Sequence, residues 1–403
     1  MTFLSPFRDG LAVASEQHEE PSSVGCVSPR RTPTGGALQE RGTSDGASRE
    51  GGGHLRLPGG RRVWRTSVVF DTYWRFAVER QAVFFRRLSG ARPPWTTDAI
   101  LAAHRFTNAY RASDRVSQYL INRVIPEGEQ SPEELFFRIL LFKLFNRIET
   151  WEYLKSSFGT PRFAEYRFEQ YDMILTRALA EHRRIYSAAY IMPSPRLGAR
   201  RKHANHLRLL EQMMADRLPS KLAEAPSLQA AYELLRGYPS LGPFLAFQFT
   251  IDCNYSSLLN YSELDFVVPG PGAADGIRKC LMDADGLNDA DVIRAMADIA
   301  DAQFTRLGLD FATLWGRPLQ LVDLQNLFCE VDKYARLAHP EVRGLSGRTR
   351  IKQTFQPAVR PLTYRYPPKW GLETSRPILV PAVTGNPDSR LDGQSQASGA
   401  SLR

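Results

Sequence analysis

Apolar residues recur at helical spacing through most of the chain, and the strict alternation typical of strands is scarce. Segments with the helical period lie at residues 66–90, 98–125, 131–159, 162–191, 203–218, 227–238, 244–259, 288–309 and 320–337. The second of these segments can be broken near residues 111–113. Only residues 264–268 and 360–366 are short strand candidates. The pattern therefore predicts an all-α, mostly helical domain.

The segment 131–159 gives the clearest helix signal in the chain. Ser131 can cap it, Pro132 stands at the first helical position and Glu134 can complete a capping box. Its apolar face is so broad that we expect one central, buried helix. Asn146 and Glu149 lie inside this apolar run, and burying them would cost free energy unless partners bind them. We therefore expect both to face a polar pocket.

Two tails flank the predicted helical domain, which spans residues 63–372. Residues 1–62 and 373–403 are rich in small and polar residues and show little apolar periodicity. Such segments cannot bury enough surface to offset the loss of chain entropy, so we expect disorder in both.

Charge, apolar runs and cysteine spacing limit the partners and the cellular compartment to be expected. The 403 residues include 52 Lys and Arg against 43 Asp and Glu, a net charge of +9 that is compatible with a nucleic-acid partner. No apolar run is long enough for a membrane span, and the N-terminus is too acidic for a secretory signal. The four cysteines are too far apart for a metal site, and free thiols suggest a reducing compartment. We expect no metal and no cofactor, and an intracellular protein, nuclear in a eukaryote.

The connection at residues 236–246 resembles the hairpin of helix-hairpin-helix DNA glycosylases. One predicted helix ends near Gly237, and the next begins at Phe244. Glycosylases of this class carry Leu-Pro-Gly-Val-Gly here, and their small residues let backbone N–H groups approach a DNA phosphate. The corresponding DNA-binding candidates are Pro239, Ser240, Leu241 and Gly242. An ordinary turn between two helices is the alternative interpretation.

A carboxylate follows this turn at a distance similar to that of the glycosylase aspartate. Asp265 is the first catalytic candidate and Glu263 the second, because glycosidic cleavage builds positive charge that a carboxylate can stabilise. Leu264 and Phe266 flank Asp265, so we expect partial desolvation; a turn or cap role is the alternative. Residues 269–276 predict a loop, and no lysine follows the turn to support a Schiff-base lyase.

Two further segments carry polar residues at helical spacing, each on one face. The first face holds Arg111, Asp114, Arg115 and Gln118, and the second holds Asp323, Asn326, Glu330 and Lys333. We expect Arg111 and Arg115 to contact DNA. The expected base pocket comprises Asp114, Gln118, Asn146, Glu149 and Asn326, and further catalytic candidates are Asp323, Glu330 and Lys333. Solvated faces with ion pairs are the alternative.

Several segments together resemble the helical domain of the 5-hydroxymethyluracil DNA kinases, near the alpha-glutamyl/putrescinyl thymine pyrophosphorylases. They are YRASDRVSQYLI, FRILLFKLFNRIETWEYL, YPSLGPFLAFQFTIDCNYS, SELDFVVPGPGAADGIRK and DLQNLFCEVDKY, within residues 65–345. The resemblance implies a domain related to helix-hairpin-helix glycosylases that handles a modified thymine in DNA. It also implies relatives that displace pyrophosphate from hydroxymethyluracil with an amine or amino acid. The sequence lacks G-x-x-x-x-G-K-[ST], so kinase activity does not carry over, and a separate P-loop kinase is a candidate partner.

Three hypotheses remain open at this point. The chain is a DNA base-modifying enzyme that flips a modified pyrimidine, a monofunctional glycosylase that excises such a base, or a DNA-binding module without activity.

Overall fold

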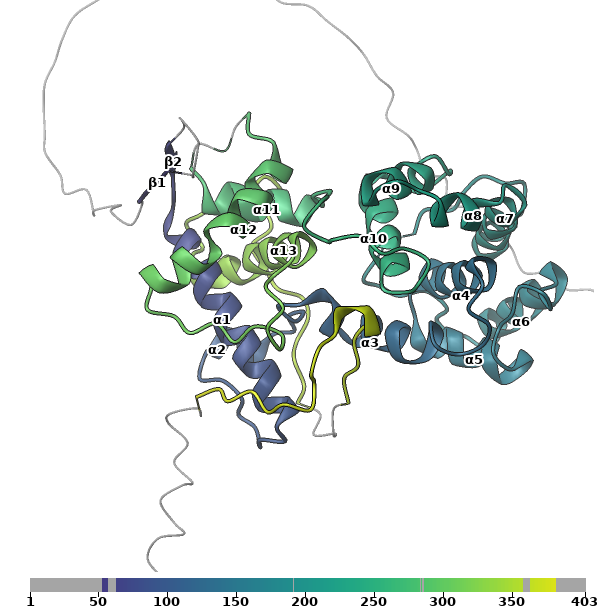
Figure 1. The fold of residues 1–403 in the computed structure, drawn as a ribbon, viewed down its shortest axis with the longest axis horizontal. Coiled ribbons are helices and arrows are strands. Elements are labelled where there is room, and N and C mark those ends of the chain that lie inside the picture. The colour runs from purple at the N-terminus through teal and green to yellow at the C-terminus, as the bar shows by residue number, and fades with distance from the viewer. Residues whose placement is uncertain are drawn as a thin grey trace, which may run out of the picture. The chain divides into compact units, whose positions relative to one another are not determined.

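The computed structural model describes residues 53–56, 63–190, 192–282, 284, 286–357 and 363–381. This part of the chain is mostly helical, which confirms the predicted class (Figure 1). It belongs to one compact unit. Of the expected tails at residues 1–62 and 373–403, residues 53–56 and 373–381 are described, and the rest lies outside the described residues. Short strands β1 (His54–Arg56) and β2 (Val63–Arg65) form an antiparallel pair, so described structure begins before the expected boundary at Val63.

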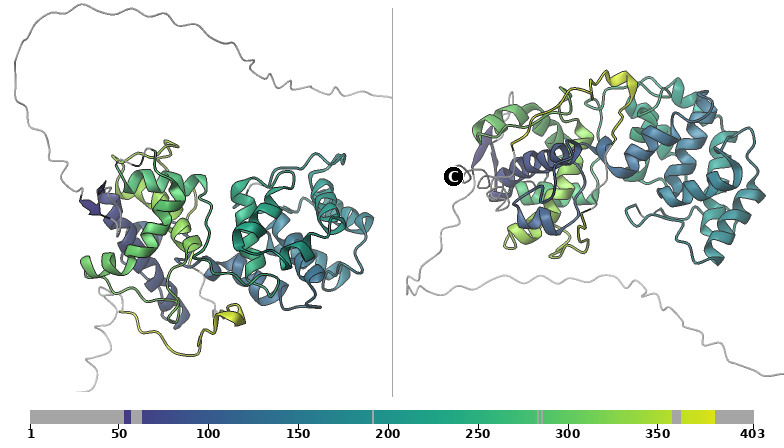
Figure 2. Two further views of the ribbon diagram at one scale, coloured as in Figure 1. Left: turned by 45° about the horizontal axis from the view of Figure 1, so that its top comes forward. Right: turned by 90° about the horizontal axis from the view of Figure 1, so that it is seen from below.

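One group of helices packs around the long C-terminal helix. Helix α13 contacts α1, α2, α11 and α12. In two further views the yellow-green α13 again lies beside the purple α1 (Figure 2). Their bounds are α1 (Val68–Leu88), α2 (Ala99–Ala103), α11 (Pro271–Cys280), α12 (Asp289–Arg306) and α13 (Leu321–Ala338). The periodic segments 66–90, 288–309 and 320–337 thus form the predicted helices.

A second group is built on α4, whose residues from Glu134 to Phe145 are all buried. Helix α4 contacts α5, α7, α8 and α10, and α6 and α9 pack on these helices. The bounds are α4 (Pro132–Phe145), α5 (Ile148–Phe158), α6 (Phe168–Ala180), α7 (Lys202–Ala215), α8 (Leu218–Ala223), α9 (Leu228–Arg236) and α10 (Pro243–Asn254). The expected central helix is therefore present, but it is shorter than predicted.

The predicted helix 131–159 is broken at Asn146. This residue ends α4 in a left-handed conformation with φ 50°, and α5 starts two residues later. Asn is one of the few residues other than Gly that adopts this conformation readily, because its side chain can bond locally. The break leaves Asn146 buried, whereas Glu149 is 54% exposed and does not join the expected pocket.

The predicted helix 98–125 is also interrupted. Only α2, η1 (Arg111–Ser113), α3 (Arg115–Tyr119) and the π-helical turn η2 (Leu120–Val124) are helical, and an extended segment joins α2 to η1. Side chains of α13 bind the backbone of that segment, so tertiary hydrogen bonds replace the helical ones there.

Two other local predictions were wrong. The expected loop 269–276 contains the start of α11, with Pro271 at a first-turn position that needs no donor. Neither strand candidate forms within the described residues, since 264–268 and 363–366 are extended or turn segments.

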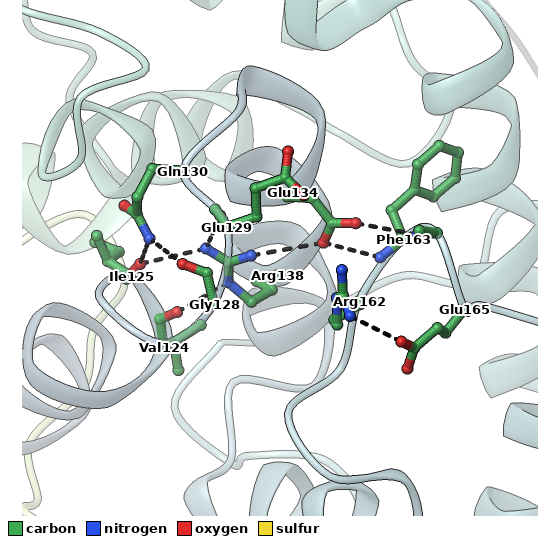
Figure 3. A network of polar contacts seen from close by, with 11 residues as sticks. Val124, Ile125, Gly128, Glu129, Gln130, Glu134, Arg138, Arg162, Phe163 and Glu165 are labelled. Carbon is green, nitrogen blue, oxygen red and sulfur yellow. Dashed lines mark hydrogen bonds and ion pairs between the residues drawn. The ribbon is translucent and has the colours of Figure 1, made fainter.

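A buried arginine fixes the chain around the start of α4 (Figure 3). The Arg138 guanidinium donates to the carbonyls of Val124 and Glu129 at 3.2 and 2.7 Å and pairs with Glu134 at 3.5 Å. The Glu134 carboxylate in turn accepts from the backbone of Phe163 at 3.0 Å. One buried ion pair thus ties two loops to the central helix.

Candidate functional site

The polar face of α13 holds the extended segment that precedes η1. The carboxylate of Glu330 accepts from the Thr107 backbone N–H at 3.0 Å, and Asn326 Nδ2 donates to Thr107 Oγ1 at 2.9 Å. The ammonium of Lys333 donates to the Arg105 carbonyl at 2.8 Å and pairs with Glu330 at 2.7 Å. The predicted common face is present, and its contacts are to backbone and side-chain groups of the protein itself.

Asp323, at the start of α13, adds to these contacts. Together with Asn326, Glu330 and Lys333 it forms what is called the α13 anchor below. One carboxylate oxygen of Asp323 accepts from the Arg111 backbone N–H at 2.8 Å and the other from Gln320 at 3.0 Å, within a capping box. Burial raises the pKa of Asp323 to about 7, with a further contribution from the charge of Glu263. Both oxygens have donors, so Asp323 is a positioning residue in this geometry.

The anchored segment places Arg111 in a buried cluster with residues of α10. Its guanidinium donates to Gln248 Oε1 at 2.9 Å, to Tyr255 OH at 3.0 Å and to Asp252 Oδ1 at 2.8 Å. Arg111 is 4% exposed. The expected contact between Arg111 and DNA is therefore not supported, because the donors point into the protein.

Helix α4 supplies a second cation to the same cluster. Lys143 Nζ lies 3.1 Å from Asp252 Oδ2 and donates to Asn146 Oδ1 at 2.7 Å. Burial lowers the pKa of Lys143, and the Asp252 carboxylate opposes that shift. Asn146 thus has the buried polar partner that the sequence pattern required. The Arg111–Asp252–Lys143 cluster joins η1, α10 and α4.

Glu263 lies in the loop after α10, which also supplies Asp252 to the buried cluster. Glu263 and the residues around it are called the Glu263 network below. Glu263 is 2% exposed; its Oε2 accepts from Arg317 at 3.2 Å, and its Oε1 is buried without a hydrogen-bond partner among the described residues. Burial raises the pKa of Glu263, and the Arg317 guanidinium opposes that shift. A desolvated carboxyl group with one unpartnered oxygen can accept or donate a proton.

The C-terminal segment 363–381 packs on the residues around Glu263. The Arg317 guanidinium lies 3.9 Å from the centre of the Trp370 ring. Lys369 Nζ donates to the carbonyls of Ser256 and Leu259 at 3.0 and 2.5 Å, and burial lowers the pKa of Lys369 to about 8. The segment therefore brings a second cation into the surroundings of Glu263.

Gln118 and Asp114 bind backbone groups. Gln118 accepts from the Arg365 N–H at 3.1 Å and donates to the Ala112 carbonyl at 2.7 Å. The carboxylate of Asp114 accepts from the Asn108 N–H at 2.8 Å, and burial raises the pKa of Asp114 to about 7. The pocket beside α1 and the smaller pocket beside α6 are lined by none of the five predicted base-pocket residues.

Asp265 shares the loop with Glu263 but is exposed. Its carboxylate makes no hydrogen bond or ion pair with another described residue, whereas its backbone carbonyl accepts weakly from Arg294 at 3.5 Å. The expected desolvation by Leu264 and Phe266 is absent, because Leu264 is also exposed and Phe266 turns toward other rings. The desolvated carboxylate of this loop is that of Glu263.

The loop of Asp265 runs along the two helices of the predicted hairpin. The Phe266 ring lies 5.1 Å from Tyr232 of α9 and 6.0 Å from Phe247 of α10, between ring centres. Farther along, Gly270 meets the Phe244 ring so closely that a Cβ atom would approach it to 2.7 Å. The α9–α10 pair and the carboxylate loop therefore form one local structure.

The turn between α9 and α10 differs in detail from the prediction. Pro239 and Gly242 are exposed, Ser240 is half-buried and Leu241 is buried. Ser240 adopts a left-handed conformation with φ 65°, whereas Gly242 has φ −65° and caps α10. The position that favours glycine is thus Ser240, and a side chain on Gly242 would meet open space.

Arg115, the other arginine expected to contact DNA, lies on α3. Its side chain is 75% exposed and lies 3.9 Å from the Glu149 carboxylate.

Sequence reasoning missed several residues of the network. Lys143 and Asp252 carried the same signal as Asn146, a polar residue within a mainly apolar helical run, and could have been found in that way. Arg317 lies in an irregular segment and Lys369 in the one-turn 3-10 helix η3 (Pro368–Trp370), and side-chain periodicity gives no information in either place. Within the described ranges, no group of His, Cys, Asp or Glu is arranged to hold a metal ion, and no helix is long and apolar enough to cross a membrane.

Comparison with known proteins agrees with the resemblance. The family model for the 5-hmdU DNA kinase helical domain matches residues 67–344, and the chain belongs to this family. A curated relative, the 5-hmdU DNA kinase of Bacillus phage SP10, is 27% identical over 291 residues. The match covers 66% of this chain and 45% of the relative, so the chain spans less than half of that protein's length. No solved structure matches the chain significantly.

Proposed function

We propose that this domain binds DNA and acts on a modified thymine base of the 5-hydroxymethyluracil type. The family supports the class of base. The observation that carries the site assignment is the loop beside α9 and α10. It holds the exposed carboxylate of Asp265 and the buried carboxylate of Glu263; among the described residues the first has no partner and the second keeps one unpartnered oxygen.

In this proposal the α9–α10 turn receives a DNA phosphate. Helix α10 begins with Gly242 and Pro243, and no side chain caps it, so its first backbone N–H groups are available to an anion. The Ser240 backbone supplies the tight bend. A nucleotide held there would turn its base out of the stack toward the carboxylate loop.

Gly242→Arg tests the DNA contact. The change fits the protein, because nothing lies within 4 Å of a Cβ at Gly242, yet its side chain would obstruct a phosphate at the turn. We expect weaker binding to duplex DNA in fluorescence anisotropy, despite the added charge. Gln212→Arg, at an exposed site on α7, is the control. Tighter, salt-sensitive binding by Gly242→Arg would contradict the contact.

The proposed chemistry is replacement of a leaving group on the base. An amine nitrogen would bond to the 5-methylene carbon while the carbon–oxygen bond to pyrophosphate breaks, and the oxygen keeps the electron pair. The amine proton needs an acceptor. Asp265 is the first candidate because it is accessible, and Glu263, with its raised pKa, is the second.

Mass spectrometry of nucleosides gives the direct test. The substrates are oligonucleotides with 5-hydroxymethyldeoxyuridine or its pyrophosphate ester, each with and without an amine donor. We expect a new modified nucleoside, formed roughly a hundredfold more slowly by a folded Asp265→Asn protein. Asp298→Asn, an exposed aspartate on α12, is the matched control. If Asp265→Asn is fully active and Glu263→Gln is not, the proton acceptor is Glu263.

Excision of the base is the second candidate function. The observation that favours it is the helical turn followed by a carboxylate loop, the arrangement expected of a monofunctional glycosylase. Abasic sites in hydroxymethyluracil DNA would establish excision. DNA binding that survives in Asp265→Asn, with no chemistry in either protein, would instead favour a binding module. For the replacement reaction, a separate P-loop kinase would be the partner that supplies the pyrophosphate ester.

A further inference from the structure

A pocket of about 260 Å³ lies beside α1, and it shares no lining residue with the Glu263 network. Its walls come from α1, the turn before α2, α2 itself and the segment after α13. The central lining residues are Arg80, Arg87, Trp95, His104, Phe106 and Phe355. Neither the α13 anchor nor the proposed function accounts for this hollow.

The aromatic walls of the pocket are held in place by contacts behind them. Trp95 Nε1 donates to the Ala91 carbonyl at 2.7 Å, and the Trp95 and Phe355 rings lie 6.4 Å apart, edge to face. The Phe355 backbone N–H donates to Ala103 at 2.9 Å, and Phe106 packs on Phe76. The hollow is therefore formed before any ligand binds, as is usual for small-molecule sites.

The charged side chains that line the pocket are arginines. Arg80 is 8% exposed; its Nε donates to the Thr107 carbonyl at 2.8 Å, and its Nη1 is buried with no hydrogen-bond acceptor among the described residues. The Arg87 guanidinium lies 5.0 Å from the centre of the Trp95 ring. No Asp or Glu is among the described lining residues. A buried guanidinium N–H without an acceptor is costly, and phosphate oxygens match its geometry.

We propose that this pocket binds a planar aromatic ring that carries a phosphate, as in a nucleotide. The ring lies against the aromatic walls, and the phosphate accepts hydrogen bonds from Arg80 and Arg87. Rings of every base pack on such walls, so the pocket selects the nucleotide class and not one base. The nucleotide is either free or a unit of single-stranded DNA, and this binding is independent of the chemistry proposed at Glu263 and Asp265.

Isothermal titration calorimetry with thymidine 5′-monophosphate, thymidine and inorganic phosphate tests the two halves of the ligand. We expect the monophosphate to bind at least tenfold more tightly than either of the others. Arg87→Gln should weaken monophosphate binding at least tenfold. Arg75→Gln, at an exposed site on the same helix and outside the pocket lining, should leave it unchanged. Phe355→Ala should weaken the nucleotide but not inorganic phosphate.

The outcomes separate the sources and the alternatives. If an oligothymidylate binds and the monophosphate does not, with the same dependence on Arg87, the ligand is a DNA-linked nucleotide and the proposal stands. Equal binding of thymidine and its monophosphate would overturn it, as would equal effects of Arg87→Gln and Arg75→Gln. Equal affinities for inorganic phosphate and thymidine monophosphate would show that the aromatic walls contribute nothing to binding, and this result would also overturn the proposal. The absence of binding by every probe to the folded full-length chain would also reject the proposal.

Discussion

Ser240 carries a backbone conformation that its side chain does not favour. Its φ of 65° lies in the left-handed region, which glycine enters without cost. We predict that Ser240→Gly leaves the free energy of unfolding unchanged or raises it by up to about 1 kcal/mol. Ser240→Val should lower it by roughly 1–2 kcal/mol, because a β-branched residue is strained there. Urea unfolding of both variants provides the measurement, and equal stability of the two would contradict the assigned conformation.

His206 is a buried imidazole whose neutral form fits its surroundings. Its Nε2 donates to the Pro193 carbonyl at 2.8 Å, and its Nδ1 accepts from Tyr186 OH at 2.7 Å. Burial lowers the pKa of His206 to about 4. The folded state therefore takes up the proton at a lower pH than the unfolded state. The stability gained from this shift is present above the unfolded pKa of about 6.5 and is lost as pH falls toward 4.

This sign gives a prediction for His206→Gln. The unfolding free energy of the wild-type protein should exceed that of the variant. This difference should be largest at pH 7.5 and should shrink steadily toward pH 4.5. The full shift corresponds to about 3 kcal/mol. Urea titrations at several pH values measure the difference, which cancels the contributions of other groups such as Asp114. A constant difference across this range would show that His206 is not buried as a neutral ring.

Helix α11 packs against α13 through glycine. A Cβ atom on Gly276 would lie 2.2 Å from the Phe328 carbonyl oxygen, which belongs to the backbone and cannot rotate away. We predict that Gly276→Ala lowers the unfolding free energy by roughly 2–4 kcal/mol, because the two helices must separate. Gly272→Ala faces the Cys329 side chain at 3.1 Å and should cost clearly less. Thermal melts of the two variants rank them, and equal losses would argue against the close helix contact.

Prediction of the helices from the sequence succeeded where the apolar periodicity is carried by residues close together in the chain. The periodicity of α1, α12 and α13 is carried by consecutive turns, so the sequence alone indicated these helices. The break at Asn146 depended on one residue in a left-handed conformation. The interruption before Arg111 depended on acceptors supplied by α13, more than two hundred residues away in the sequence. Partners at such separations are invisible to a periodic pattern.

The start of α11 shows a different reason for failure. Pro and Gly normally mark turns, yet Pro271 suits the first turn of a helix, and Gly272 and Gly276 suit close contact with α13. The same residues can therefore end or begin an element, depending on what packs beside them.

The candidate site was predicted only in part. The loop of Glu263 and Asp265 and the common face of α13 were identified from spacing, but their environments were not. Spacing could not tell that Glu263 is buried beside Arg317 while Asp265 is exposed, because Arg317 enters from another part of the chain. The functional roles of these residues stay predictions until the nucleoside assay is done.

Across the described chain, charged groups are buried where separate segments meet. Arg111 links η1 to α10, Lys143 links α4 to the same helix, and Arg317 links Glu263 to the segment of Trp370. Breaking a buried pair leaves an uncompensated charge, so such links require their partner segments to be in place. The carboxylate loop therefore depends on the C-terminal segment for its electrostatic environment.

Two truncations test this dependence on residues 363–381. A chain that ends at residue 362 loses the Lys369 bonds, the Trp370 ring over Arg317, the Tyr366–Ser113 hydrogen bond of 2.8 Å and the Arg365–Gln118 bond. We predict a loss of roughly 4 kcal/mol in the free energy of unfolding, since each buried hydrogen bond contributes about 1 kcal/mol. A chain that ends at residue 381 keeps these contacts and should differ from the full chain by less than about 1 kcal/mol, because residues 382–403 have few apolar groups to bury.

Urea unfolding of both chains gives the measurement. The substitution Trp370→Ala, which removes only one side chain of the segment, serves as a comparison. If the chain ending at 362 were as stable as the chain ending at 381, the C-terminal segment would not support the Glu263 environment.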